Sequence, residues 1–256
     1  MRIVSAEKGI ASMKNKSLTA MLFISLMAMA AMAVIGRGAL SIHPLHPFQF
    51  ASLLLLGVLT SRLKVRLPGL TGNMSMNLPF ILLAIVQLGL FEAAAIAFAS
   101  TLIQSLPKRG LQLRPTQLLF NVSTMTTAAG LAYLVFHEFD GRHGATGSPA
   151  LVLAAATYFF INTLPVATII CLTEGAKIVR TWSGIVHLSF PYYVAGTGIT
   201  SILTGKSGYM AWALSIGALP VMIKIYRSYC TYFGEMVTAR HDSTESRPLT
   251  KAAAAR

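Results

Sequence analysis

Two polar side chains within a long apolar stretch are the first candidates for chemistry. Gln87 and Glu92 flank a glycine-containing turn, and Glu92 is the one acidic residue between Glu7 and Glu138. An ionisable residue near a membrane core is a functional candidate by default, so we predict that both side chains bind a ligand. The alternative for Glu92 is structural, because the helix dipole attracts a carboxylate in the first turn of a helix.

A second group of polar side chains consists of amides near the ends of apolar segments. The functional interpretation is a polar relay between the helices and a cytoplasmic partner. The alternative is helix packing, since such side chains hydrogen-bond between helices for ~0.6 kcal/mol on average. Asn162 and His187 are further candidates for this group. Its four members are Asn77, Gln104, Gln117 and Asn121.

The histidines match no known metal-binding motif. One pair lies in HPLHP, and the other lies in HEFDGRH, where the two histidines are six residues apart and do not match HExxH. We expect HEFDGRH to be a solvated outer loop and predict no metal site. The sequence contains no nucleophile elbow, P-loop or dinucleotide fingerprint. We therefore predict no catalytic residue, no cofactor and no enzymatic activity.

The composition indicates the environment that positions these residues. Hydrophobic residues make up 54% of the 256 residues and charged residues only 11%. A soluble protein of this length needs more charge on its surface, so the chain is predicted to be a polytopic membrane protein. The class is all-α, because the apolar runs are continuous, whereas the strands of a membrane barrel alternate.

The formal net charge of +13 does not point to nucleic acid, because the basic residues lie between the apolar runs. This distribution is typical of membrane topology and of contact with anionic lipids, so the lipid bilayer is the predicted partner. Cys171 and Cys230 both fall on the predicted cytoplasmic side, and we expect no disulfide between them.

About eight transmembrane helices are predicted in this bundle. The first is interpreted as a retained helix; a cleaved signal peptide is the alternative, because the residues AMAA resemble a cleavage site. The predicted helices cover residues 18–35, 48–63, a hairpin within 76–106, 115–135, 150–172, 184–203 and a last segment from about 209.

The hairpin is predicted from its length. Met76–Leu106 is 31 residues, roughly 46 Å as one helix, which is too long for one upright span of ~20 residues. A break at Gly89 and Glu92 divides it into two short helices with an outer turn. Such a break returns both flanking basic clusters to one face of the membrane.

The distribution of basic residues predicts the orientation. With the N-terminus inside, eighteen of the 21 lysines and arginines are cytoplasmic, and only Arg37, Arg142 and Lys206 are outside. The positive-inside rule therefore places both termini in the cytoplasm of a bacterial inner membrane. The predicted organisation is a basic N-terminus (1–16), a transmembrane bundle (17–235) and a disordered cytoplasmic tail (236–256).

Residues 48–137 resemble a known family. The segments KVRLPGLTGNMSMNLPFILLAIVQLGLFEAAAIAFASTLIQ and RPTQLLFNVSTMTTAAGLAYLVFH are similar to the membrane-associated sensor modules of the MASE type. In bacterial cyclic-di-GMP signalling proteins these modules precede HD-type phosphohydrolase and GGDEF domains. The usual turn reads Gly-Thr-Met-Ser, whereas here Asn73 follows Gly72. No GGDEF or HD segment follows the last predicted helix, so we do not carry over the enzymatic output.

The resemblance implies an integral membrane sensor or adaptor that acts through a cytoplasmic signalling protein or as a homo-oligomer. Two alternatives remain open at this stage. One is a transport component similar to the membrane subunits of energy-coupling-factor transporters, with an outward-facing pocket near Gln87 and Glu92. The other is a structural subunit of a membrane complex that has no ligand.

Overall fold

The computed structural model describes residues 2–41, 46–66, 73–106, 112, 114–143 and 148–204, and a few single positions between 220 and 231. The predicted last helix from about residue 209 and the tail 236–256 lie outside the ranges described as elements. The all-α prediction is confirmed for the described residues. Their helices are α1 (Arg2–Leu40), α2 (Pro47–Ser61), α3 (Leu78–Gln87), α4 (Leu90–Ser105), α5 (Pro115–His143), α6 (Ser148–Glu174) and α7 (Ile178–Thr204).

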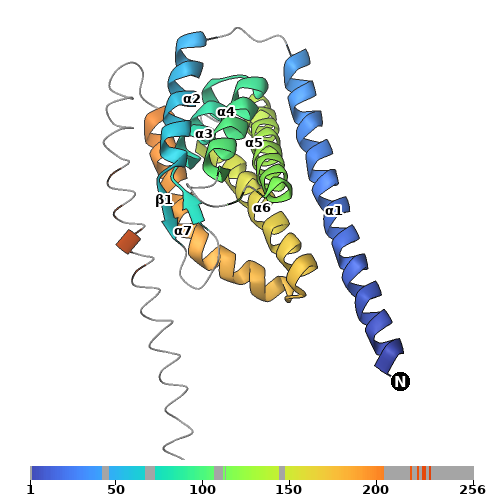
Figure 1. The fold of residues 1–256 in the computed structure, drawn as a ribbon. Helices are drawn as coiled ribbons and strands as arrows, with labels where there is room; N and C mark the ends of the chain where they lie inside the picture. Colours follow the sequence, from blue (N-terminus) through green and yellow to red (C-terminus); the bar gives the residue numbers. More distant parts are fainter. Residues whose placement is uncertain are drawn as a thin grey trace, which may run out of the picture.

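Three helices are longer than the sequence predicts. α1 begins at Arg2 instead of Leu18, α5 continues through His143, and α7 begins at Ile178. The added segments contain no proline, so no residue forces the helix to end where the apolar run ends. Hydropathy therefore underestimates the length of these helices. The N-terminal end of α1 extends past the other helices (Figure 1).

The predicted division into two short helices is confirmed, but the break lies at Leu88 and Gly89 only, and Glu92 belongs to α4. α3 ends at Gln87, Gly89 is the N-cap of α4 in an extended conformation, and α4 ends at Ser105. At 10 and 16 residues, the two helices are about 15 and 24 Å long, each shorter than the ~30 Å hydrocarbon layer. Leu90, beside the turn, is only 2% exposed, so the bundle covers this side of the turn.

A short antiparallel ladder precedes the hairpin and was not predicted. β1 (Lys64–Arg66) pairs with β2 (Asn73–Ser75) in the register Lys64 with Ser75, Val65 with Met74 and Arg66 with Asn73. The backbone of Leu63 also accepts a hydrogen bond from the N–H of Met76 at 3.3 Å. The ladder therefore fixes the distance between the end of α2 and the start of α3.

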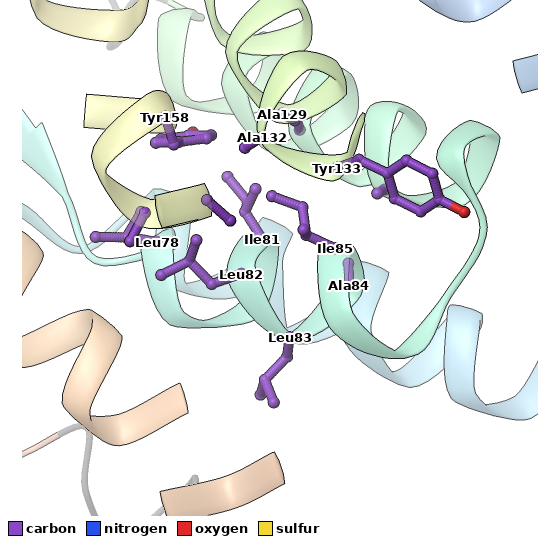
Figure 2. Packing of buried hydrophobic residues seen from close by; sticks show 14 of the residues in the cluster. Leu78, Ile81, Leu82, Leu83, Ala84, Ile85, Ala129, Ala132, Tyr133 and Tyr158 are labelled. Atoms are coloured by element: carbon purple, nitrogen blue, oxygen red, sulfur yellow. The ribbon is translucent and has the colours of Figure 1, made fainter. Parts of the chain in front are cut away.

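α3 is the centre of the bundle. Its first eight residues are all buried, and α2, α4, α5, α6 and α7 pack around it. Figure 2 shows Ile81 and Ile85 on the side of α3 that faces Ala129 and Ala132 of α5, while Leu83 projects from another side. A helix that is apolar all round is stable only when it is buried on every side.

The outer helices carry a face suited to lipid. Leu22, Met29 and Met32 of α1 are more than half exposed, although they are large and apolar. In the part of the chain that the structure describes, three helices are long and apolar enough to cross a membrane, namely Leu18–Leu40, Pro115–Asp140 and Pro149–Glu174. An exposed apolar surface of this extent is typical of a helical membrane protein.

Side-chain contacts between neighbouring helices give their relative directions. Phe23 packs against Phe120 and Val34 packs against Gly130, so α1 and α5 run parallel. α2 and α3 are antiparallel, because Gln49 contacts Gln87 while Leu63 contacts Met76. In the same way α6 and α7 are antiparallel: Tyr193 contacts Tyr158 and Asn162, and Trp182 contacts Thr163.

Candidate functional site

A tyrosine of α7 caps the beginning of α3. The Tyr192 hydroxyl accepts a hydrogen bond from the backbone N–H of Leu78 at 3.0 Å and donates one to the carbonyl of Ser75 at 2.7 Å. The first N–H groups of a helix have no partner within the helix. Asn77 is the N-cap of α3, but its side chain makes no capping hydrogen bond. A side chain 114 residues away therefore does the capping instead.

The side chain of Asn77 joins two other elements. Its Nδ2 donates to the Ser100 hydroxyl at 3.1 Å, and the Ser75 hydroxyl lies 2.8 Å from its Oδ1. The same Ser75 hydroxyl lies 2.8 Å from Oε1 of Gln104. Because a hydroxyl carries one hydrogen, the two amide oxygens compete for it. We call Ser75, Asn77, Ser100, Gln104 and Tyr192 the polar network.

The structure brings together only part of the predicted amide group. Asn77 and Gln104 both belong to the polar network, and Asn77 is 2% exposed. Gln117 is exposed on the first turn of α5 and Asn121 is half-buried one turn later. Neither contributes to the polar network. Sequence spacing placed all four at one depth, but only packing decides which way each side chain points.

The two further candidates have local partners. Asn162 of α6 donates a hydrogen bond to the hydroxyl of Tyr193 at 2.7 Å, which joins α6 to α7. His187 is exposed, and its Nδ1 lies 2.8 Å from the carbonyl oxygen of Ser183 in the previous turn. Asn162 therefore acts in helix packing, separately from the polar network.

A close approach of α7 holds the polar network in place. A Cβ atom added at Gly196 would lie 2.8 Å from the Leu78 side chain, so the absence of a side chain lets α7 contact the start of α3. One turn later, the Thr200 hydroxyl lies 2.9 Å from the carbonyl oxygen of Gly196 and 3.4 Å from that of Pro79. Small residues at helix contacts allow this kind of packing in membranes.

Gln87 lies at the opposite end of the bundle from the polar network. Its Oε1 accepts a hydrogen bond from Nε2 of Gln49 at 2.7 Å, which joins the end of α3 to the start of α2. This contact is the interhelical hydrogen bond that amides commonly make within membranes. A ligand at Gln87 remains a prediction and would have to compete with Gln49 for the amide oxygen.

Glu92 is buried in the first turn of α4, where its exposed fraction is 5%. Its carboxylate interacts electrostatically with Tyr133, whose hydroxyl is also hydrogen-bonded to the backbone of Leu90. Gly89, the N-cap, offers no capping side chain, so a first-turn carboxylate is favourable next to the free N–H groups. The position of Glu92 is compatible with a carboxylate that stabilises the start of α4. Ligand binding by Glu92 remains a prediction.

The sequence predicts that HEFDGRH is a loop, and this prediction is wrong: the segment forms the last turns of α5. Nε2 of His137 lies 3.2 Å from the carbonyl oxygen of Ile85, so this nitrogen carries a hydrogen and donates it. The ring of His137 also packs against that of Tyr133, with centroids 4.1 Å apart and the planes tilted by 46°. Within the described part of the chain, no three His, Cys, Asp or Glu residues gather as metal ligands.

Three members of the polar network were missed by the sequence analysis. Ser75 lies at the end of β2 and Ser100 in α4, and the short hydroxyl side chains of serines commonly bond only to nearby backbone groups. Tyr192 had a signal, since it follows Pro191 in the middle of a helix predicted to span the membrane. A tyrosine hydroxyl buried in a membrane helix needs a hydrogen-bond partner, and that requirement could have marked it.

One of three comparisons with known proteins identifies a family for this chain. The model of the MASE9 family, a family of membrane-associated sensors, matches residues 10–234. Comparison with curated proteins and with solved structures gives no significant match. The family match extends well beyond residues 48–137, and it covers α3, α4 and α7, the helices that form the polar network. The chain therefore belongs to the MASE9 family of membrane-associated sensor modules.

Proposed function

We propose that this protein is a multi-pass sensor of the bacterial inner membrane that signals to a separate cytoplasmic protein. The observation that carries the proposal is the family match across residues 10–234. Input modules of this type detect a stimulus in or near the membrane and leave the chemistry to another domain. The chain then needs no catalytic residue of its own.

The proposed orientation places the N-terminus and the polar network on the cytoplasmic side. Consecutive helices alternate in direction, so the ends of α2, α4 and α6 lie at the same end of the bundle as the start of α1. This end holds Arg62, Arg114, Lys177 and Arg180, whereas Arg37 lies at the other end. The positive-inside rule favours the basic end as cytoplasmic. With the predicted last helix, the bundle has eight spans.

The polar network is the proposed element of transmission. It joins α3 and α4 to α7 at the cytoplasmic end, and the Ser75 hydroxyl can donate its hydrogen to Asn77 or to Gln104. A switch requires two alternative arrangements, because a stimulus can then shift the population between them. A cytoplasmic partner would read the resulting change in α4 and α7.

Cyclic-di-GMP signalling is the proposed context, on the basis of the resemblance described above. The test compares the intracellular cyclic-di-GMP concentration in the native host with and without the gene. We expect the deletion to change this concentration and Ser75→Ala to shift it in the same direction. Ser201→Ala, at an exposed site on α7, is the control that should match wild type. An unchanged concentration in the deletion strain would refute the cyclic-di-GMP context.

A second experiment locates the partner. A photo-crosslinking amino acid at Arg62, exposed at the basic end, should capture a cytoplasmic protein, and one at Ser41, exposed at the other end, should not. A crosslinked product of twice the chain mass would indicate a homo-oligomer. Capture from Ser41 but not from Arg62 would contradict the proposed orientation.

A further inference from the structure

α1, α4 and α5 line a partly open cavity at the end of the bundle away from the polar network. Its volume is about 300 Å³, and its wall is almost entirely apolar. Cavities of this size are at the lower limit of those that hold small ligands. Glu92 and Gln87 are not among its lining residues. The side chains that define it are Val34, Arg37, Leu90, Thr127, Leu131 and Leu134.

Thr127 is an unpartnered polar group in this wall. It is 5% exposed, and its hydroxyl has no hydrogen-bond partner among the described residues. Thr163 and Thr204 bond to the carbonyl four residues earlier, whereas the buried hydroxyls of Thr101, Thr124 and Thr126, like that of Thr127, have no partner among the described residues. A buried hydroxyl without a partner is destabilising, so a bound acceptor that reaches Thr127 would be stabilising.

Arg37 supplies a positive charge at the same cavity. It lies in the last turn of α1, is exposed, and forms no ion pair with any residue in the described ranges. On the proposed topology it is one of three basic residues on the outer side, where basic residues are few. A guanidinium group binds phosphate through two parallel hydrogen bonds. The charge therefore favours an anionic head group at the entrance.

We propose that this cavity binds one acyl chain of an anionic phospholipid. The chain would fill the apolar interior, the phosphate would bind Arg37, and an ester carbonyl would accept a hydrogen bond from Thr127. A free fatty acid offers a charge and a chain but no ester carbonyl below its head. A zwitterionic phospholipid offers the chain and the ester but no net negative charge. Lipid binding here does not depend on the proposed cytoplasmic partner.

The cavity is held open by close contacts of α1 on both sides of it. A Cβ atom at Gly38 would lie 2.9 Å from the backbone of Phe91, and a Cβ atom at Gly130 would overlap the side chain of Val34. These contacts fix α1 against α4 and α5, the two helices that line the cavity with it. A preformed site avoids the cost of ordering its walls on binding.

The test measures lipid binding to the purified full-length chain in neutral detergent. Dioleoylphosphatidylglycerol, dioleoylphosphatidylcholine and oleate are titrated separately, and bound lipid is counted by native mass spectrometry. We expect phosphatidylglycerol to bind tightest. Arg37→Gln should weaken its binding about fivefold, which corresponds to ~1 kcal/mol for one basic side chain near an anionic surface. Arg180→Gln, an exposed arginine of α7, is the matched control and should bind like wild type.

Two variants test the interior. Thr127→Val keeps the shape and removes the hydroxyl, so it should weaken phosphatidylglycerol about two- to tenfold while leaving oleate unchanged. Ala33→Phe should fill the cavity and abolish binding; if it fails to fold, the exposed Arg37→Gln variant decides. Equal affinity for the two phospholipids, equal affinity in Arg37→Gln and Arg180→Gln, or tighter binding of oleate would each overturn the proposal.

Discussion

Gly130 of α5 lies directly against Val34 of α1, so closely that a Cβ atom at Gly130 would overlap the Val34 side chain. We expect Gly130→Ala to push α1 away and to lower the thermal stability of the purified protein. Overpacking at a tight contact costs typically about 1–3 kcal/mol.

The matched control is Gly36→Ala, because nothing lies within 4 Å of a Cβ atom at Gly36. This change should be neutral or slightly stabilising, since alanine is the better helix former. The double variant Gly130→Ala with Val34→Ala should recover part of the loss. If Gly130→Ala and Gly36→Ala melt at the same temperature, the close contact between α1 and α5 is wrong.

Tyr192→Phe tests the cap on α3. The change leaves the N–H of Leu78 and the carbonyl of Ser75 without this partner in a buried environment. Each unsatisfied buried group costs about 1–3 kcal/mol, so we expect a clear fall in melting temperature. Tyr193→Phe, the same change one residue later, breaks a half-buried contact to Asn162 and should cost less. A larger effect at Tyr193 would argue against the cap.

Glu92 can be tested by chemistry that separates a cap from a ligand site. If Glu92 only caps α4, Glu92→Asp should change stability little and Glu92→Gln should cost ~0.3–1 kcal/mol. If it holds a buried cationic partner or ligand, both variants should lose ~3–5 kcal/mol. Thermal stability, measured with and without whatever co-purifies, distinguishes the two. We expect the Gln variant to lose part of its stability and the Asp variant to stay near wild type.

The proposed topology can be checked with reporter fusions. A fusion in the connection between α5 and α6 should report an external location, and a fusion between α6 and α7, near Lys177, should report a cytoplasmic one. The expectation follows from the charge asymmetry, since only Arg37, Arg142 and Lys206 lie on the predicted outer side. If the α5–α6 fusion is cytoplasmic, the proposed orientation and the count of eight spans both fail.

The sequence by itself determined the class of this protein and its helical hairpin. Long apolar runs in a chain with 11% charged residues leave helices in a membrane as the stable solution, because each helix satisfies its own backbone. Gly89, followed by a carboxylate at Glu92, marks the break between α3 and α4 because both residues favour the start of a helix. The motif around Ser75 and Asn77 was enough to suggest the family. These features are local, so residue type and spacing report them directly.

Tertiary structure alone decided which polar residues meet. Asn77 and Gln104 join Ser75, while Gln117 at a similar predicted depth faces away, because side-chain direction depends on how each helix is rotated against its neighbours. The cap that Tyr192 places on α3 spans 114 residues, and the cavity beside Arg37 exists only where three helices meet. Contacts between distant segments arise from packing, and the hydropathy of a single helix does not predict them.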